Sequence, residues 1–469
     1  MFLARQYYTQ RPNPLMAGKL LTILRPWSVC VLLVVLCCCA PAFIVAQAPA
    51  PSPSGAFMPS VVTVPAEAQA GSNFNANRAT EAYLAQIPPD AKARSDSYFQ
   101  GGYWLILWDF LYAVAVALLL LNLRWSAKFR DVTERITRLK PLQTFLYWCQ
   151  YAIIAFVLSL PISIYEGYLR EHKYGLATQT FGPWMGDQLK ALLLSVVLGG
   201  LVVTALFGIV RRLRETWWIW GAVVTFIFFT IGVLISPVFI APMFNTYKRL
   251  DDPKITGPIL SLARANGIPV RDVFKVDASR QSTRMSANVS GVGGTMRITL
   301  NDNLLNRASP EEVQAVMGHE MGHYVLNHVY KLLLFGGVII FLFFALLRWG
   351  LNWSLARWGE RWQVRELVDP AIIPLVFLIA SIFFFVLTPI TNTYVRTQEH
   401  EADMYGINAS RQPDGFAQAA IHLGEYRKMS PGIWEERIFF DHPSGRNRIH
   451  DAMQWKAENI ALMESHGEK

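Results

Sequence analysis

The chain has 469 residues, more than one hydrophobic core normally accommodates, so at least two structural units are expected. Hydrophobic residues make up 52% and charged residues only 16%, and the apolar residues come in blocks, which is typical of a membrane protein. The formal net charge of +9 does not indicate nucleic-acid binding, because Lys and Arg lie mostly in short segments that flank the apolar blocks.

The N-terminal residues 1–48 have the pattern of an export signal. Basic residues without acidic ones precede an apolar run over 27–45, and Ala46-Gln47-Ala48 follows it. Because the run is long for a signal core, the sequence predicts either a cleaved signal peptide or a first spanning helix. Four of the five cysteines lie in this run, so no disulfide framework is expected. Residues 49–102 are expected to form a linker, which begins rich in Ala, Pro and Ser.

Six apolar blocks follow, each about long enough to cross a hydrocarbon core of ~30 Å. Four of them make up a predicted membrane region over 103–241, and two more fall within 330–390. The blocks lie near 103–124, 143–165, 187–210, 217–241, 330–347 and 370–390. Two polar stretches, 242–329 and 391–469, carry the motifs described below and are expected to form the two parts of one catalytic domain.

The distribution of basic residues predicts the orientation in the membrane. If every block spans, four segments rich in Arg or Lys lie on the same side of the membrane. They are the N-terminus, the 124–142 loop, Arg211 to Arg214 and the 348–369 loop. By the positive-inside rule this side is cytoplasmic. We therefore expect a multi-pass protein of the bacterial inner membrane, with its catalytic domain on the non-cytoplasmic side.

The segment that begins at Ser309 has the signals of a helix start. Ser309, Pro310 and Glu312 fit the N-cap, the first helical position and the partner residue of a capping box. The residues that follow are then helical and include His319-Glu320-Met321-Gly322-His323. Two histidines four residues apart share a helix face and can bind one metal ion, and Glu320 between them can contact the water molecule bound to that ion. Imidazole nitrogens with one carboxylate favour a single catalytic Zn²⁺ per chain.

A third metal ligand is expected from the helix that follows the last apolar block. This segment reads Glu399-His400-Glu401-Ala402-Asp403. Glu399 and Asp403 are four apart, so Glu399 could bind the metal while Asp403 accepts a hydrogen bond from a ligand histidine. His400 and Glu401 are competitors, and the spacing does not rank the three.

Two further segments are candidates for substrate contact. In the loop that begins at Asp441, a donor could stabilise the oxyanion of peptide hydrolysis, although a Ser444 helix cap with surface arginines is the simpler interpretation. Residues 285–300 predict a hairpin of two strands around Gly293-Gly294. Its exposed edge could pair with an extended peptide, or it is an ordinary sheet edge.

The chain resembles the CAAX prenyl protease 1 family over about 103–455. The resemblance is carried by the predicted helix with His319 and His323, called the zinc helix below, and by the Glu399 segment, His442-Pro443 and Arg448. The resemblance implies an α-helical multi-pass membrane protein of six or seven spanning helices around a chamber, with an α+β gluzincin-type zinc peptidase domain. It also implies His319, His323 and Glu399 as ligands, Glu320 as general base and Asp403 as the partner of a ligand histidine. His442 and Arg448 would then assist at the oxyanion, and Ala287 and Asn288 would bind substrate.

The sequence therefore predicts a membrane-embedded zinc metalloendopeptidase. Its expected partners are the lipid bilayer and a peptide or protein substrate, with or without a lipid, and no nucleic acid. An alternative with the same chemistry is a quality-control protease that resembles HtpX and acts on misfolded membrane proteins. From another class, a transporter or channel with a structural metal would fit Pro161, Pro237 and Pro389 as sites of broken helices.

Overall fold

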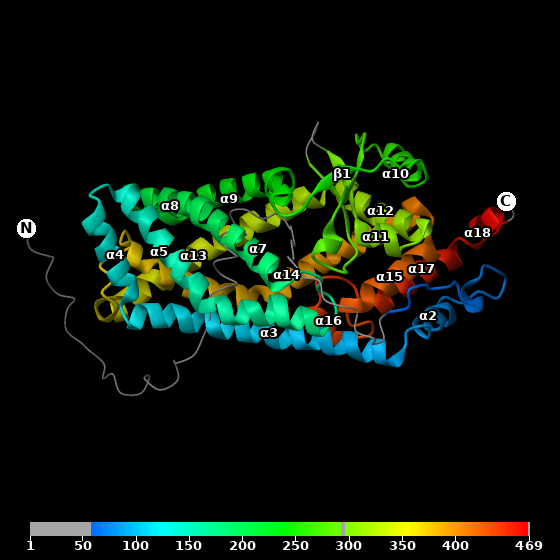
Figure 1. Ribbon diagram of the computed structural model, residues 1–469, viewed down its shortest axis with the longest axis horizontal. Coiled ribbons are helices and arrows are strands. Elements are labelled where there is room, and N and C mark those ends of the chain that lie inside the picture. The colour runs from blue at the N-terminus through cyan, green and yellow to red at the C-terminus, as the bar shows by residue number, and fades with distance from the viewer. Residues whose placement is uncertain (1–57, 292–295, 468–469) are drawn as a thin grey trace, which may run out of the picture.

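The protein is an elongated, mostly helical molecule with a membrane bundle at one end and a smaller α+β part at the other (Figure 1). The structure is a computed structural model that describes residues 58–291 and 296–467. The predicted signal peptide or first spanning helix over 1–48 lies outside these residues. The elements up to the sheet are η1 (Ala66–Ala68), α2 (Ala76–Leu84), α3 (Pro89–Asn122), α4 (Trp125–Ile136), α5 (Lys140–Ile164), η2 (Tyr165–Arg170), α6 (Glu171–Lys173), α7 (Phe181–Leu194), η3 (Ser195–Gly199), α8 (Gly200–Arg212), α9 (Trp217–Ile235), η4 (Ser236–Ile240) and η5 (Ala241–Met243).

The second half of the chain forms the sheet and then returns to the membrane bundle. Its elements are β1 (Tyr247–Arg249), α10 (Pro253–Ala265), β2 (Val273–Val276), η6 (Ala278–Arg280), β3 (Ala287–Ser290), β4 (Arg297–Asn301), α11 (Asp302–Arg307), α12 (Pro310–Val325), α13 (His328–Trp362), η8 (Pro370–Ile372), α14 (Ile373–Ser410), α15 (Pro413–His422), η9 (Leu423–Tyr426), α16 (Ile433–Phe439), α17 (Gly445–Glu458) and α18 (Ile460–Gly467).

Six helices of the described chain are long and apolar enough to cross a membrane, as the sequence predicts. They cover Pro89–Asn122, Lys140–Lys173, Phe181–Arg212, Trp217–Met243, His328–Trp362 and Pro370–Ser410. Each of these helical stretches is longer than its apolar block. Pro161 and Pro389 lie inside continuous helices, and Pro237 lies in the π-helical η4 that continues α9 within the span Trp217–Met243, so none of the three marks a broken span.

The structure differs from the predicted linker over 49–102. Helix α2 begins at the N-cap Asn75, and α3 already begins at Pro89. Tyr83 of α2 is fully buried in a hydrophobic cluster with residues of α15 and α17, and its hydroxyl donates to Asp414 at 2.8 Å. This short helix buries mainly alanines and Tyr83 against distant parts of the chain, so its apolar face is difficult to recognise in the sequence.

The sheet has four strands in the order β1-β2-β4-β3, with β2 and β4 parallel and the other two pairs antiparallel. Strands β3 and β4 pair as the predicted hairpin, from Ala287 opposite Leu300 to Ser290 opposite Arg297. The predicted Gly293-Gly294 turn lies outside the described residues. Because β3 ends the strand order and lies against α12, it is an edge strand beside the predicted zinc helix.

Helix α14 joins the membrane bundle to the α+β part without interruption. It has 38 residues, a length of about 57 Å at 1.5 Å per residue. Its first half carries the last apolar block and its second half carries Glu399 and Asp403. The boundary predicted between residues 390 and 391 therefore falls inside one helix, which places the Glu399 segment on a rigid extension of a membrane span.

Candidate metal and catalytic site

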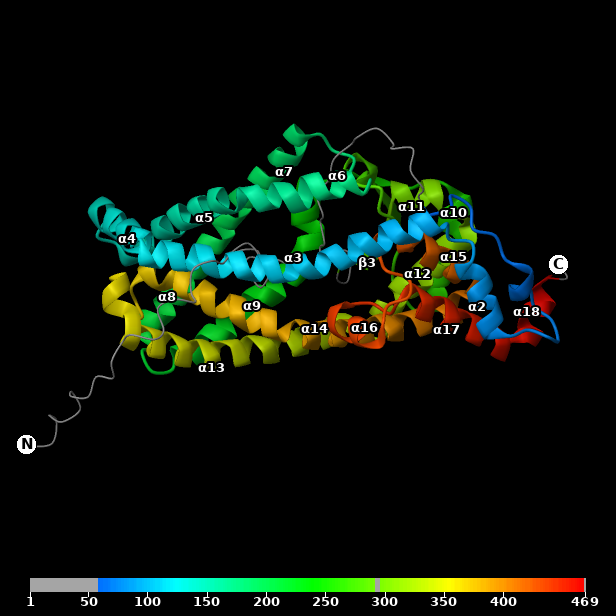
Figure 2. The ribbon, with the colours of Figure 1, turned by 90° about the horizontal axis from the view of Figure 1, so that it is seen from below.

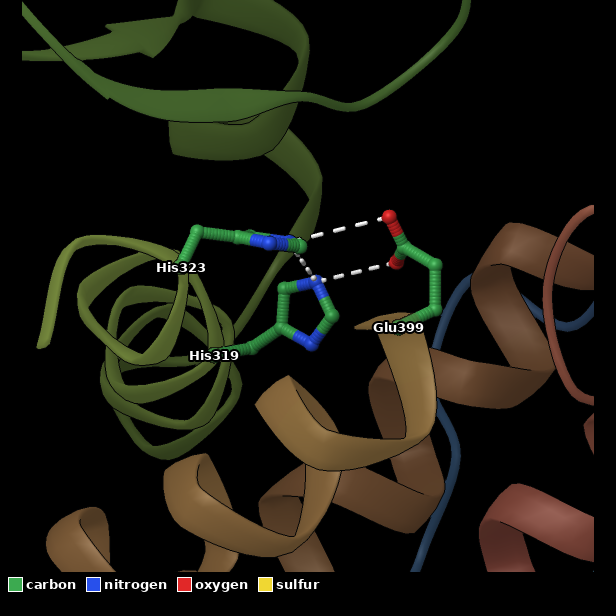
Figure 3. A group of neighbouring side chains, drawn as sticks. All are labelled: His319, His323 and Glu399. Atoms are coloured by element: carbon green, nitrogen blue, oxygen red, sulfur yellow. Dashed lines mark hydrogen bonds and ion pairs between the residues drawn. The ribbon is translucent and has the colours of Figure 1, made fainter. Parts of the chain in front are cut away.

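Three side chains from two helices converge at one point. His319 and His323 lie on α12 and Glu399 lies on α14, and one ligand atom from each falls within 4.8 Å of the others (Figure 3). The two histidine Nε2 atoms are 3.1 Å apart. Glu399 Oε2 lies 3.3 Å from His319 Nε2, and Glu399 Oε1 lies 3.7 Å from His323 Nε2.

These separations suit a tetrahedral metal ion. Ligand atoms at 2.0–2.1 Å from a tetrahedral zinc lie roughly 3.3 Å apart. The two histidine Nε2 atoms are close to this separation at 3.1 Å, and each lies 3.3 or 3.7 Å from a different oxygen of Glu399. The donor set of two imidazoles and one carboxylate is also that of catalytic zinc sites. The residues therefore fit zinc both in chemistry and in spacing.

The start of α12 fixes the position of the histidines along the helix. Ser309 Oγ accepts from the Glu312 backbone N–H at 3.2 Å, and Glu312 Oε2 accepts from the Ser309 backbone N–H at 2.7 Å. This is the predicted capping box, with Pro310 at the first helical position. Glu312 also contacts the buried His422 of α15 at 2.6 Å, which ties the helix start to the hydrophobic cluster beneath it.

Small residues let α12 and α14 approach closely enough for Glu399 to reach both histidines. A Cβ atom on Gly406 would lie 2.5 Å from the backbone nitrogen of His319, and one on Gly318 would lie 2.7 Å from the Gly406 carbonyl oxygen. A Cβ on Gly322 would meet the Ala402 backbone at 3.1 Å. Because the obstructing atoms are backbone, a side chain here must separate the two helices.

We therefore expect Gly406→Ala to weaken zinc binding, although Gly406 is not itself a proposed ligand. Overpacking of this kind costs about 1–3 kcal/mol of stability, and separation of the helices moves Glu399 away from the histidines. The measurements are thermal unfolding and zinc affinity of the detergent-purified variant. Gly257→Ala, on α10 with nothing within 4 Å of its Cβ position, is the control and should leave zinc affinity unchanged without lowering the unfolding temperature. Zinc affinity equal to wild type in Gly406→Ala would contradict the role given to this contact.

His319 has a buried ion pair behind it. Its Nδ1 lies 2.7 Å from Asp403 Oδ1, and Asp403 in turn accepts from Arg448 Nε at 2.9 Å and from Arg448 Nη2. Burial lowers the pKa of His319, but the hydrogen bonds to Asp403 and Glu399 outweigh it and raise this pKa to about 10. Arg448 Nε and Nη2 are thus directed at Asp403, which differs from the predicted place of Arg448 at the oxyanion.

Glu320 and His323 have pKa values displaced by burial. Burial raises the pKa of Glu320 to about 7, against the opposing charge of His319. Among the described residues no hydrogen bond or ion pair to the Glu320 carboxylate is found, so it is free to accept a proton. Burial lowers the pKa of His323 to about 3, and repulsion from His319 adds to this effect.

His442 reaches the same site from the loop before α17. Its Nε2 lies 3.0 Å from Glu399 Oε2 and its Nδ1 lies 2.8 Å from Asp441 Oδ1. Burial would raise the pKa of Asp441, but His442 outweighs it and lowers this pKa to about 2. Ser444 caps α17 through the Asn447 backbone N–H, as the simpler interpretation of this loop expects.

The remaining sequence candidates lie around this centre or face away from it. Ala287 and Asn288 are on the edge strand β3, with Asn288 exposed. His400 is 52% exposed and lies 3.4 Å from Asp451 of α17. Glu401, a competitor of Glu399 in the sequence, contacts His328 instead of the two ligand histidines, and His328 in turn contacts His323.

Family models match almost all of the described chain. Residues 249–456 match peptidase family M48, and residues 73–246 match the CAAX prenyl protease N-terminal region described as five membrane helices.

Curated proteins and a solved structure agree with the family models. An uncharacterized metalloprotease of Bacillus subtilis, YhfN, is 29% identical over 330 residues, 70% of this chain and 77% of that protein. CAAX prenyl protease 1 of Saccharomyces cerevisiae is 30% identical over 263 residues, 53% of this chain and 58% of that protein. The crystal structure of S. mikatae Ste24p matches with a TM-score of 0.68 at 23% identity, over 78% of this chain and 89% of that one, which shows the shared fold.

Proposed function

The chain belongs to the CAAX prenyl protease 1 family of membrane metalloendopeptidases, and from this premise we propose that it hydrolyses peptide bonds with one Zn²⁺ held by His319, His323 and Glu399. The observation that carries the proposal is the convergence of two imidazoles from α12 and one carboxylate from α14, with the histidine Nε2 atoms 3.1 Å apart and each of them facing one oxygen of Glu399. Peptidases of family M48 depend on zinc in general.

Glu320 is the proposed general base. When bound, zinc supplies acidification of a water molecule and polarisation of the scissile carbonyl. Glu320 takes the proton from the attacking water and passes it to the leaving amine as the peptide bond breaks. A carboxylate with a pKa near 7 can carry out both transfers near neutral pH.

Three residues support the reaction from around the metal. Asp403 orients His319 by accepting its Nδ1–H, and Arg448 holds Asp403 in place through its two donors. We therefore propose Arg448 as a positioning residue for Asp403. His442 approaches the site from the side of Glu399, where its Nε2–H can donate to the oxyanion that forms on the carbonyl.

The proposed substrate is an extended peptide segment that pairs with β3. The outer edge of β3 is not covered by another strand of the described chain, and Ala287 and Asn288 lie on it beside α12. Main-chain hydrogen bonds to this edge would hold the peptide in an extended form, independent of its side chains.

The lipid requirement is tested with three substrates in parallel. A farnesylated C-terminal peptide, its unmodified form and a casein-like protein are incubated with the detergent-purified enzyme and with the Glu320→Gln variant. Because the chain belongs to the prenyl protease family, we propose a lipidated segment as the preferred substrate, so the farnesylated peptide should be cleaved faster than its unmodified form. Preference for the unfolded protein would instead favour a quality-control role.

We also propose an orientation in a bacterial inner membrane, which is supported by the place of the basic loops. The flanks of α4, the end of α8 and the end of α13 lie together at the end of the molecule remote from α12 (Figures 1 and 2). They carry the residues Arg124, Lys128, Arg130, Arg135, Arg138, Lys140, Arg211, Arg212, Arg214, Arg357, Arg361 and Arg365. We propose that this end is cytoplasmic and the zinc site is on the other side.

We expect alkaline phosphatase fused after Lys469 to be active in a bacterial host, because this enzyme matures only outside the cytoplasm, and a green fluorescent protein at the same position to be dark. Fusions after Arg138, in the basic loop between α4 and α5, are the matched control and should give the opposite pair of signals. A fluorescent C-terminal fusion would reverse the proposed orientation.

A further inference from the structure

A third histidine lies directly behind the proposed ligand His323. His328 Nδ1 is 2.8 Å from His323 Nδ1, and the two rings meet edge to face with centroids 5.0 Å apart. The His328 side chain is 7% exposed, and its Nε2 lies 3.1 Å from Glu401 Oε2. Glu401 is also paired with Lys331. A chain of contacts therefore leads from His323 through a buried ring to the protein surface.

A break between two helices brings His328 back to His323. Residues five apart do not share a face of one continuous α-helix, so the sequence alone separates these two rings. Helix α12 ends at Val325, and Asn327 adopts the left-handed conformation with φ 57° and ψ 37° before α13 begins at His328. This turn points the first side chain of the membrane helix back at the last turn of the zinc helix.

The proton positions in this chain of contacts are set by the direction of the His323 ring. His323 Nε2 faces His319 and Glu399, so it is the atom that would bind zinc, and its Nδ1 then carries the hydrogen. His323 Nδ1–H needs an acceptor, which His328 Nδ1 provides in the tautomer with hydrogen on Nε2. His328 Nε2–H donates in turn to the Glu401 carboxylate.

From this geometry we propose that His328 is a positioning residue for the zinc ligand His323, and that Glu401 fixes the tautomer of His328 that can do so. The inference rests on the proposed zinc site. Helix α14 then provides one ligand, Glu399, and a supporting carboxylate for each ligand histidine, because Asp403 contacts His319 directly and Glu401 contacts His323 through His328. Partners of this kind typically contribute 10–100-fold to metal affinity.

The test is zinc affinity, measured by competition with a chromophoric chelator on detergent-purified protein. His328→Phe keeps a ring but removes the acceptor, so we expect zinc affinity to fall by about 10–100-fold. His328→Asn places an oxygen close to the former Nδ1, so it should recover most of the loss. Glu401→Ala, at a side chain that is 40% exposed, should weaken zinc binding by about 10-fold while the protein remains folded.

The control for general damage is His172→Phe. His172 is a partly buried histidine of α6 that contacts the Tyr168 ring and carbonyl oxygen but no proposed ligand, so its replacement should leave zinc affinity unchanged. Wild-type zinc affinity in His328→Phe, or equal losses in the Phe and Asn variants, would overturn the inference. If the Phe variant does not fold, unchanged zinc affinity in Glu401→Ala would do so. A wild-type protein that binds no zinc would instead refute the proposed function.

Discussion

Glu320→Gln should bind zinc as wild type does and lose peptide cleavage almost completely. Gln has nearly the same volume as Glu and leaves the three proposed ligands in place, but it cannot accept a proton from water. General base catalysis contributes about 10²–10⁴-fold to a rate, so we expect kcat to fall by at least about 10²-fold. The measurement is turnover of a fluorogenic peptide together with the zinc content of the same preparation.

The control for this variant lies on the same helix. Glu311 is exposed in the first turn of α12, remote from the histidine face, so Glu311→Gln should change neither zinc content nor kcat. Wild-type rates in Glu320→Gln would eliminate the proposed mechanism, and loss of zinc together with activity would show that Glu320 supports the metal rather than the proton transfer.

Glu399→Ala should abolish stoichiometric zinc binding. Two neighbouring histidines remain in this variant, but the site loses one of three protein ligands and the negative charge that offsets the metal. The buried helix contact around Gly318 and Gly406 holds α12 and α14 in place, so the two histidines should keep their positions in this variant. Zinc analysis after gel filtration, with peptide turnover on the same sample, measures the effect.

His400→Ala is the matched control, one residue further along α14. His400 is half exposed and faces Asp451, so its removal should leave zinc content and turnover at wild-type values. The opposite pattern, with zinc retained in Glu399→Ala and lost in His400→Ala, would show that the wrong member of the Glu399-His400-Glu401 segment was chosen.

The zinc helix could be predicted from the sequence because its signals are local. Ser309, Pro310 and Glu312 define where α12 begins, and helical periodicity then places His319 and His323 on one face. The six spans follow from hydropathy in the same way, and the β3–β4 pairing follows from two β-rich runs around a glycine pair.

Other parts depend on contacts between distant segments. Nothing in the spacing of residues 399–403 distinguishes Glu399 from Glu401, because the choice is made by the rotation of α14 against α12, which Gly318 and Gly406 set. The backbone turn at Asn327 decides that His328 faces His323. Helix α2 was not predicted, because its small apolar face is buried only through contacts with the distant helices α15 and α17.

The most direct test of the central claim is the zinc content and peptidase activity of purified wild-type protein before and after chelation. We expect close to one zinc per chain, loss of cleavage when the metal is removed, and recovery on addition of one equivalent of zinc. Undiminished cleavage by the metal-free protein, or a folded protein that binds no zinc, would contradict the account.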